Sequence, residues 1–187
     1  KENNTFGIPD LIVRSDYLNK ITEQDNISVD DIKMGCAFSP TWHYRIVEIK
    51  FTTLKMIDNY IYNVGNIVAY KSQAIIYNDA LAVLQKFNPK VSYLLGRKVN
   101  INDNKYMGFY KLGKIDYGRK DSKIKVRTEK AIDWIKKLKN EGGDWIINPP
   151  SCKELYPNMS NRLDYPWHGV KKEIANKVKD ITMLWNC

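Results

Sequence analysis

The pattern of apolar and polar residues along the chain predicts alternating strands and helices. Short apolar, β-branched runs at 6–14 and 91–99 are typical of strands, and we expect the first of them to be largely buried. Residues 43–53 also have a strand-like pattern, with different side chains on the two faces. Between 63 and 86, apolar side chains recur every three or four positions, which predicts a long amphipathic helix.

The remaining segments predict shorter elements. These are a short helix that begins near Ser28, a hairpin within 106–119, a basic helix over 129–139, a Pro-rich loop over 145–167 and a last helix over 170–184. The order of the elements predicts an α/β fold with a central mixed β-sheet flanked by α-helices.

Composition and charge narrow the class of protein. The 187 residues include 43% hydrophobic and 27% charged residues, which excludes collagen-like, disulfide-scaffold and wholly disordered chains. No apolar run approaches the roughly 20 residues needed to span a bilayer, so we expect no membrane partner. The chain carries 30 Lys and Arg against 21 Asp and Glu, a formal net charge of +9, which favours a polyanionic partner such as nucleic acid.

The three cysteines, Cys36, Cys152 and Cys187, are far apart and form no CxxC pair. This spacing excludes a disulfide framework, a four-ligand zinc site and an iron–sulfur cluster. We therefore expect free thiols, no iron–sulfur cluster and an intracellular, cytoplasmic location, which for a viral protein would be the host cytoplasm.

Two predicted strands carry charged residues that suit a metal site. Asp10 follows Pro9 where the first strand begins, and Glu48 and Lys50 lie on one face of the second strand, with Ile49 on the opposite, buried face. If the strands lie side by side, two carboxylates, the Ile49 carbonyl and one ammonium converge. Such oxygen ligands suit Mg²⁺ or Mn²⁺, and the adjacent ammonium could hold or polarise an attacking water. This chemistry is that of phosphodiester hydrolysis.

Each of these motifs, and a further pair on the long helix, also has an ordinary structural interpretation. A Pro-Asp pair is common in turns, and a Glu-x-Lys pair on a strand is commonly a solvated charge pair. Gln73 and Tyr77, four residues apart on the long helix, could serve only for packing and hydration. The three motifs follow one another in the chain, two on strands and the third on a helix. This order favours a metal-dependent nuclease.

These motifs resemble those of a known superfamily. The pair at Pro9-Asp10 and Glu48-Ile49-Lys50 resembles the PD-(D/E)xK nucleases, and Gln73 with Tyr77 resembles the QxxxY motif of their RecB/AddB branch. That branch also includes λ exonuclease, YqaJ-type viral recombinase nucleases and the Cas nucleases of CRISPR adaptation. The blocks IVEIKFTT, YKSQAIIYNDAL, SYLLGRK and VKKEIANKVKDITMLWN look like Cas-like nucleases of giant viruses associated with virophage defence.

The resemblance implies a restriction-endonuclease-like fold and a role for each motif residue. Asp10, Glu48 and the Ile49 carbonyl would be metal ligands, and Lys50 would be the catalytic lysine. Gln73 and Tyr77 would position the substrate strand and the metal-bound water. The implied activity is Mg²⁺- or Mn²⁺-dependent hydrolysis of DNA, mainly as an exonuclease with some single-strand endonuclease activity, in recombination, repair or defence against foreign DNA.

Basic residues outside the motifs are candidates for binding DNA phosphates, and the alternative for each is a solvated surface position. The candidates are Arg97, Lys98, Arg119, Lys120 and Arg127.

We expect residues 1–187 to form a single nuclease domain, with a core over about 6–100 and a helical and loop extension over about 101–187. The chain is expected to be a fragment, since only nine residues precede Asp10, where the resembling nucleases carry a further helix. Two alternatives stay open. One is a non-catalytic nucleic-acid-binding module of nuclease fold, and the other is a nuclease subunit active only with a helicase or recombinase. The pattern does not decide the oligomeric state.

Overall fold

A computed structural model of the chain describes residues 7–184. The chain divides into two compact units, Lys1–Ala131 and Ile132–Cys187. Within the described residues, no helix combines the length and the apolar character that crossing a membrane requires.

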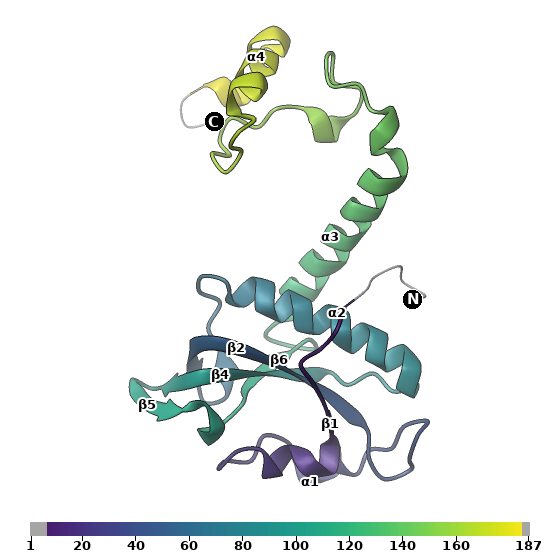
Figure 1. The fold of residues 1–187 in the computed structure, drawn as a ribbon, viewed down its shortest axis with the longest axis vertical. Coiled ribbons are helices and arrows are strands. Elements are labelled where there is room, and N and C mark those ends of the chain that lie inside the picture. Colours follow the sequence, from purple (N-terminus) through teal and green to yellow (C-terminus); the bar gives the residue numbers. More distant parts are fainter. Residues whose placement is uncertain (1–6, 185–187) are drawn as a thin grey trace. The chain divides into compact units, whose positions relative to one another are not determined.

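The first unit is built on a six-stranded mixed sheet. Its strands are β1 (Leu11–Arg14), β2 (Tyr44–Ile57), β3 (Tyr60–Ile61), β4 (Val91–Ile101), β5 (Asn104–Met107) and β6 (Gly113–Asp116). They follow the order β1-β2-β3-β6-β4-β5, and β2 also pairs with β4. The β2–β4 pair is parallel and β1 runs antiparallel to β2, so the prediction of an α/β fold with a mixed sheet is confirmed (Figure 1).

Four α-helices and five short 3₁₀-helices complete the described part of the chain. They are α1 (Val29–Ile32), α2 (Ile67–Gln85), α3 (Ser122–Glu141), α4 (His168–Val178), η1 (Ser15–Lys20), η2 (Gly108–Tyr110), η3 (Gly142–Asp144), η4 (Lys153–Leu155) and η5 (Ile181–Met183). The predicted start near Ser28 is confirmed, because its hydroxyl accepts a hydrogen bond from the Asp31 N–H. The long central helix is also confirmed. The last helix ends earlier than predicted, because Lys179 takes a left-handed conformation with a φ of 52°.

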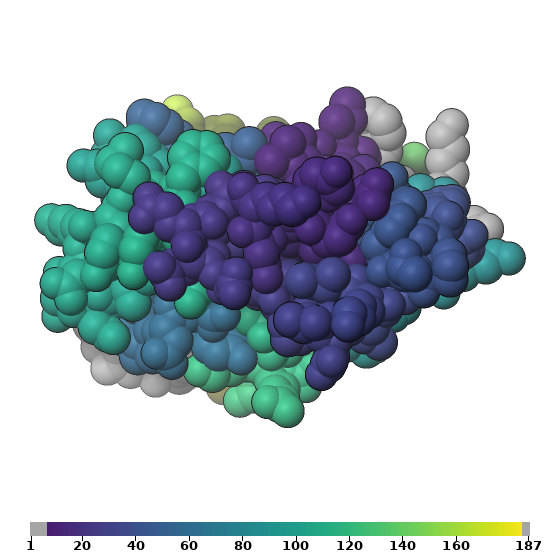
Figure 2. Space-filling view, turned by 90° about the horizontal axis from the view of Figure 1, so that it is seen from below, coloured from purple at the N-terminus to yellow at the C-terminus, as the bar shows by residue number. Residues whose placement is uncertain are grey.

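Two apolar clusters place the helices on opposite faces of the sheet. In the first, Leu54, Met56 and Leu94 of the strands pack against Ala74 and Ile75 of α2. The second cluster lies on the other face, under η1 and α1, and consists of Leu18, Ile27, Val47, Tyr93, Leu95 and Leu112. Figure 1 shows α2 across one face and α1 on the other, and Figure 2 shows the N-terminal segment, purple to dark blue, over much of the second face.

The structure corrects two expectations of burial. β1 is an edge strand, with Leu11 36% and Ile12 50% exposed, because it pairs only with β2. The faces of β2 are also reversed at the Glu-x-Lys motif, since Glu48 is 2% exposed and Ile49 is 46% exposed. The reason is that α2 covers the face of Glu48, whereas η1 and α1 cover the opposite face only as far as Val47.

The predicted hairpin within 106–119 is wrong. The hairpin joins β4 to β5 instead, through Asn102 and Asp103, whose φ values are 49° and 65°. Asn and Asp tolerate this left-handed region better than most residues, which makes them suitable for a tight turn. The segment after β5 enters η2 and then β6, which pairs with both β3 and β4.

A buried histidine beside β2 predicts that the protein loses stability in mild acid. The Arg45 Nε donates to His43 Nε2 at 2.7 Å, so the proton of the neutral ring lies on Nδ1 and is donated to the Met34 carbonyl at 2.7 Å. Burial lowers the pKa of His43 below its ordinary 6.5, the Met34 carbonyl raises it in part, and Arg45 lowers it further.

Because the unfolded chain protonates this histidine near pH 6.5 and the folded chain does not, the free energy of unfolding should fall as the pH drops below about 6.5. Urea unfolding at pH 7.5, 6.5 and 5.5 measures the slope, and His43→Gln should flatten it. Equal slopes for the two proteins would contradict this assignment.

Candidate active site

The pairing of β1 with β2 brings the two predicted carboxylates together. The register aligns Leu11 with Val47, so Asp10 comes opposite Glu48. The Asp10 N–H points at Glu48 Oε2 at 3.4 Å, and Asp10 Oδ2 accepts a hydrogen bond of 2.7 Å from the Ile49 N–H. Asp10 is thus brought into one cluster with Glu48 and Ile49, which follow it by 38 and 39 positions in the chain.

Lys50 joins this cluster to α2. Its Nζ donates to Glu48 Oε1 at 2.7 Å and to Gln73 Oε1 at 2.8 Å. The Gln73 Nε2 in turn donates to the Tyr77 hydroxyl at 3.0 Å. Two residues of spacing on a strand and four on a helix keep each pair on one face, which is why the local pattern already placed them in pairs. Four of the predicted side chains therefore form one hydrogen-bonded series, and Asp10 joins it through its backbone N–H.

The charges of the series are partly shielded from water. The Glu48 side chain is 2% exposed and Lys50 is 18% exposed, while Asp10 is exposed. A buried carboxylate needs a paired charge or hydrogen bonds, and Lys50 supplies both. The Lys50 Nζ also lies 5.2 Å from the centroid of the Tyr70 ring, in the range of a cation–π contact. The site is thus closed on the α2 side and open at Asp10.

The edge of β2 opens at the same place. β1 pairs with residues 44–47 of β2 and begins at Leu11, so the Ile49 N–H binds the Asp10 side chain instead of a strand. A strand residue turns its N–H and its carbonyl toward the same edge, so the Ile49 carbonyl faces the side of Asp10. The register of β2 with β4 also shifts between Lys50 and Thr53, a β-bulge of the kind often found beside active sites.

Sequence reasoning missed two residues of the site. Tyr70 belongs to the apolar stripe of α2, and its spacing of three residues before Gln73 is the pattern that could have revealed its contact with Lys50. Gly7 lies against Tyr77, because a Cβ at Gly7 would come within 2.3 Å of the Tyr77 ring. Glycine lets the chain leading to Asp10 pass this close to α2, since a larger residue would displace the Tyr77 ring.

The cluster offers oxygen atoms of the kind that hard metal ions prefer as ligands. In residues 7–184, no three or more His, Cys, Asp and Glu side chains gather in a group that could hold a metal. Asp10, Glu48 and the Ile49 carbonyl form a smaller set made only of oxygen donors. Glu48 uses Oε1 for Lys50 and keeps Oε2 on the side of Asp10. Two carboxylates and a carbonyl, with Asp10 exposed to solvent, fit Mg²⁺ or Mn²⁺.

Among the basic candidates, Arg97 lies nearest to the cluster. Gly96, directly before it, pairs with Lys50 across β2 and β4. The Arg97 guanidinium lies over the Phe51 ring, 5.0 Å from its centroid. Lys98 follows on the same strand. The structure therefore places these two basic residues on the strand that pairs with the Lys50 stretch of β2, with the Arg97 guanidinium on Phe51 and not on the carboxylates.

The other basic candidates lie elsewhere. The Lys120 Nζ is 3.8 Å from the centroid of the Tyr60 ring. Tyr60 pairs with the last residue of β2, which is about 23 Å along the strand from Lys50. Arg119 precedes Lys120 in the same turn, and Arg127 is exposed on α3. The structure does not bring Arg119 and Lys120 to the carboxylate cluster.

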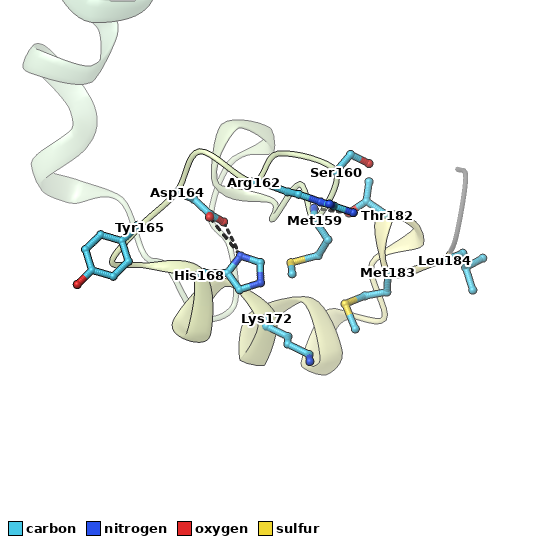
Figure 3. Close-up of a pocket in the computed structure, with 10 residues that line it drawn as sticks. All are labelled: Met159, Ser160, Arg162, Asp164, Tyr165, His168, Lys172, Thr182, Met183 and Leu184. Carbon is cyan, nitrogen blue, oxygen red and sulfur yellow. Dashed lines mark hydrogen bonds and ion pairs between the residues drawn. The ribbon is translucent and has the colours of Figure 1, made fainter.

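The second unit contains a cavity that lacks a pair of carboxylates. Its volume is about 910 Å³, and its lining includes Arg162, His168 and Lys172 (Figure 3). Its only lining carboxylate, Asp164, is bonded to His168 at 3.0 Å and paired with Lys171. The hydrogen bond from Lys171 lowers the pKa of Asp164 most, and the contact with His168 lowers it further. The β1–β2–α2 cluster is therefore the stronger candidate for hydrolytic chemistry.

Comparison of the chain with models of protein families, with curated proteins and with solved structures finds no match in any of the three.

Proposed function

We propose that this chain is a divalent-metal-dependent deoxyribonuclease with a restriction-endonuclease-like fold. The observation that carries the proposal is the hydrogen-bonded series from Asp10 through Glu48 and Lys50 to Gln73 and Tyr77. It combines a pair of carboxylates, an ammonium and two polar groups from a neighbouring helix at an open sheet edge. This set of groups suits hydrolysis of a phosphodiester.

Asp10, Glu48 and the Ile49 carbonyl would hold the cation. When bound, Mg²⁺ or Mn²⁺ neutralises charge on the phosphate and makes a bound water a better nucleophile. Lys50, fixed between Glu48 and Gln73, is placed to stabilise negative charge that develops on the phosphate oxygens.

Gln73 and Tyr77 are suited to positioning. Both ends of the Gln73 amide are engaged, since its oxygen accepts from Lys50 and its nitrogen donates to the Tyr77 hydroxyl oxygen. The amide is therefore held in one orientation. Because the Tyr77 oxygen accepts this bond, its own hydrogen is left to donate to a substrate oxygen.

Charge supports DNA as the substrate. Between residues 105 and 130 the chain has nine Lys and Arg against three Asp and Glu. A polyanion with regularly spaced phosphates would gain from this excess, and its affinity should fall steeply as salt rises.

The test of the proposal is cleavage of end-labelled single- and double-stranded DNA in Mg²⁺, Mn²⁺ or EDTA. We expect cleavage with either cation and none in EDTA, and shortening from one end would identify an exonuclease. DNA binding without cleavage would contradict the proposal and favour a non-catalytic binding module. Cleavage only after addition of a helicase or recombinase would favour a subunit that depends on its partner.

Replacing Lys50 should affect catalysis more than binding. We expect Lys50→Met to lower kcat by about 10²- to 10⁴-fold, because the ammonium acts on the reacting phosphate. The affinity for DNA should change little, since Lys50 is already bonded to Glu48 and Gln73. Single-turnover cleavage and binding in EDTA separate the two effects.

The matched control is Lys55→Met, which removes an exposed lysine from the same strand. Equal losses in the two variants would show that only the net charge matters.

A further inference from the structure

Large apolar side chains are exposed beside the candidate active site. Phe51, the residue after Lys50, is 87% exposed, and Ile49 is 46% exposed. Met107 and Phe109, on β5 and η2, are 64% and 59% exposed. Single exposed apolar residues are ordinary on a protein surface, whereas a group of them marks a surface that binds something.

The backbone places these residues on the two sides of one stretch of β4. Gly108, between Met107 and Phe109, packs so closely on β4 that a Cβ there would overlap the carbonyl group of Gly96 and approach Arg97. Gly96 is also the partner of Lys50 in the β2–β4 pairing. The segment that carries Phe109 therefore lies against the same stretch of β4 as the Lys50 end of the site.

The guanidinium of Arg97 contacts the exposed ring of Phe51. The Arg97 guanidinium lies 5.0 Å from the centroid of Phe51, and Arg97 is itself exposed. None of the ion pairs among the described residues includes Arg97. An exposed aromatic ring with a guanidinium over one face can stack a nucleobase on its other face, and the guanidinium can bind a nearby phosphate.

We propose that Phe51 and Arg97, with Phe109 on the other side of β4, form a stacking platform for unpaired bases, defined here as the Phe51 platform. This inference rests on the proposed function and names its substrate class, which is single-stranded DNA or the unpaired end of a duplex. In an intact duplex both faces of each base are covered by its neighbours, so a protein ring reaches them only where the strands have separated. Phe51 follows Lys50 directly on β2 but points to the opposite face of the strand, at the edge that β1 leaves open. The positive charge of Arg97 favours nucleic acid over a second protein as the occupant.

Binding measured in EDTA tests the platform without any cleavage. We expect Phe51→Ala to lower the affinity for a fluorescein-labelled single-stranded oligonucleotide by about 5- to 150-fold. Phe51→Trp should restore it, because indole also stacks. The affinity for a relaxed, covalently closed circular duplex should change by less than about twofold, since all of its bases are paired and stacked on both faces. An oligonucleotide carrying 2-aminopurine should show quenching with the parent protein and with Phe51→Trp.

Phe38→Ala is the matched control, because Phe38 is 56% exposed and packs edge-on against Tyr44, outside the platform. Unchanged single-strand affinity in Phe51→Ala would overturn the inference, as would equal losses for single strands and duplex. A change from oligomer to monomer in Phe51→Ala would also overturn it and assign the surface to a second copy of the chain. Since EDTA removes the cation, failure of the nuclease proposal leaves the binding result intact, and the two failures can be told apart.

Discussion

Glu48→Gln should lower the rate of metal-dependent DNA cleavage by a factor on the order of 10³ while the protein stays folded. In the parent, Glu48 Oε1 accepts from Lys50 and Oε2 lies on the side of Asp10. An amide has a single oxygen, so it can lie on the side of Lys50 or on the side of Asp10, and an NH₂ group, which cannot bind a cation, takes the other position. The substitution keeps the size of the side chain, which preserves the packing under α2.

The measurement is the initial rate of cleavage of single-stranded DNA at saturating Mg²⁺, together with the far-ultraviolet circular dichroism and the Tm of the variant. Glu23→Gln is the control, because it removes the same charge from an exposed position of the same unit. Asp10→Asn should reproduce the loss. Cleavage at the parental rate by either the Glu48 or the Asp10 variant would show that these carboxylates are not the catalytic pair.

Lys71→Met should destabilise the protein by about 3–5 kcal/mol, because it leaves a buried carboxylate without its partner. The Lys71 Nζ lies 2.6 Å from Asp121 Oδ1, and both side chains are 2% exposed. The ammonium also donates to the Ile61 carbonyl at 2.9 Å. Burial lowers the pKa of Lys71, and the hydrogen bond to Asp121 opposes this shift. The pair links α2, which carries Gln73 and Tyr77, to the turn before α3.

Urea unfolding measures this effect, and a double variant isolates its cause. Adding Asp121→Asn to Lys71→Met removes the unpaired charge, while the amide oxygen can still accept the 2.9 Å bond from the Asp116 N–H. We expect the double variant to be more stable than Lys71→Met alone.

Lys125→Met removes one partner of the more exposed Lys125–Asp79 pair and should cost no more than about 1 kcal/mol. A double variant no more stable than Lys71→Met would contradict the argument from buried charge.

The sequence determined the local features of this protein. The recurrence of apolar residues identified α2, the Ser28 hydroxyl marked the start of α1, and β-branched runs identified the strands. Spacing alone paired Glu48 with Lys50 and Gln73 with Tyr77, since backbone geometry over a few residues decides which side chains share a face. Charge and the motif residues pointed to a phosphodiester substrate, which stays a proposal until cleavage is measured.

The tertiary structure decided everything that depends on which segments meet. Periodicity assigns residues to two faces but does not say which face will be covered, so the burial of Glu48 and the exposure of Ile49 followed from α2 and η1 alone. The same holds for β1 at the sheet edge and for the Lys71–Asp121 pair, whose partners are 50 residues apart. Burial and long-range pairing arise from packing between distant segments, which the local sequence pattern does not predict.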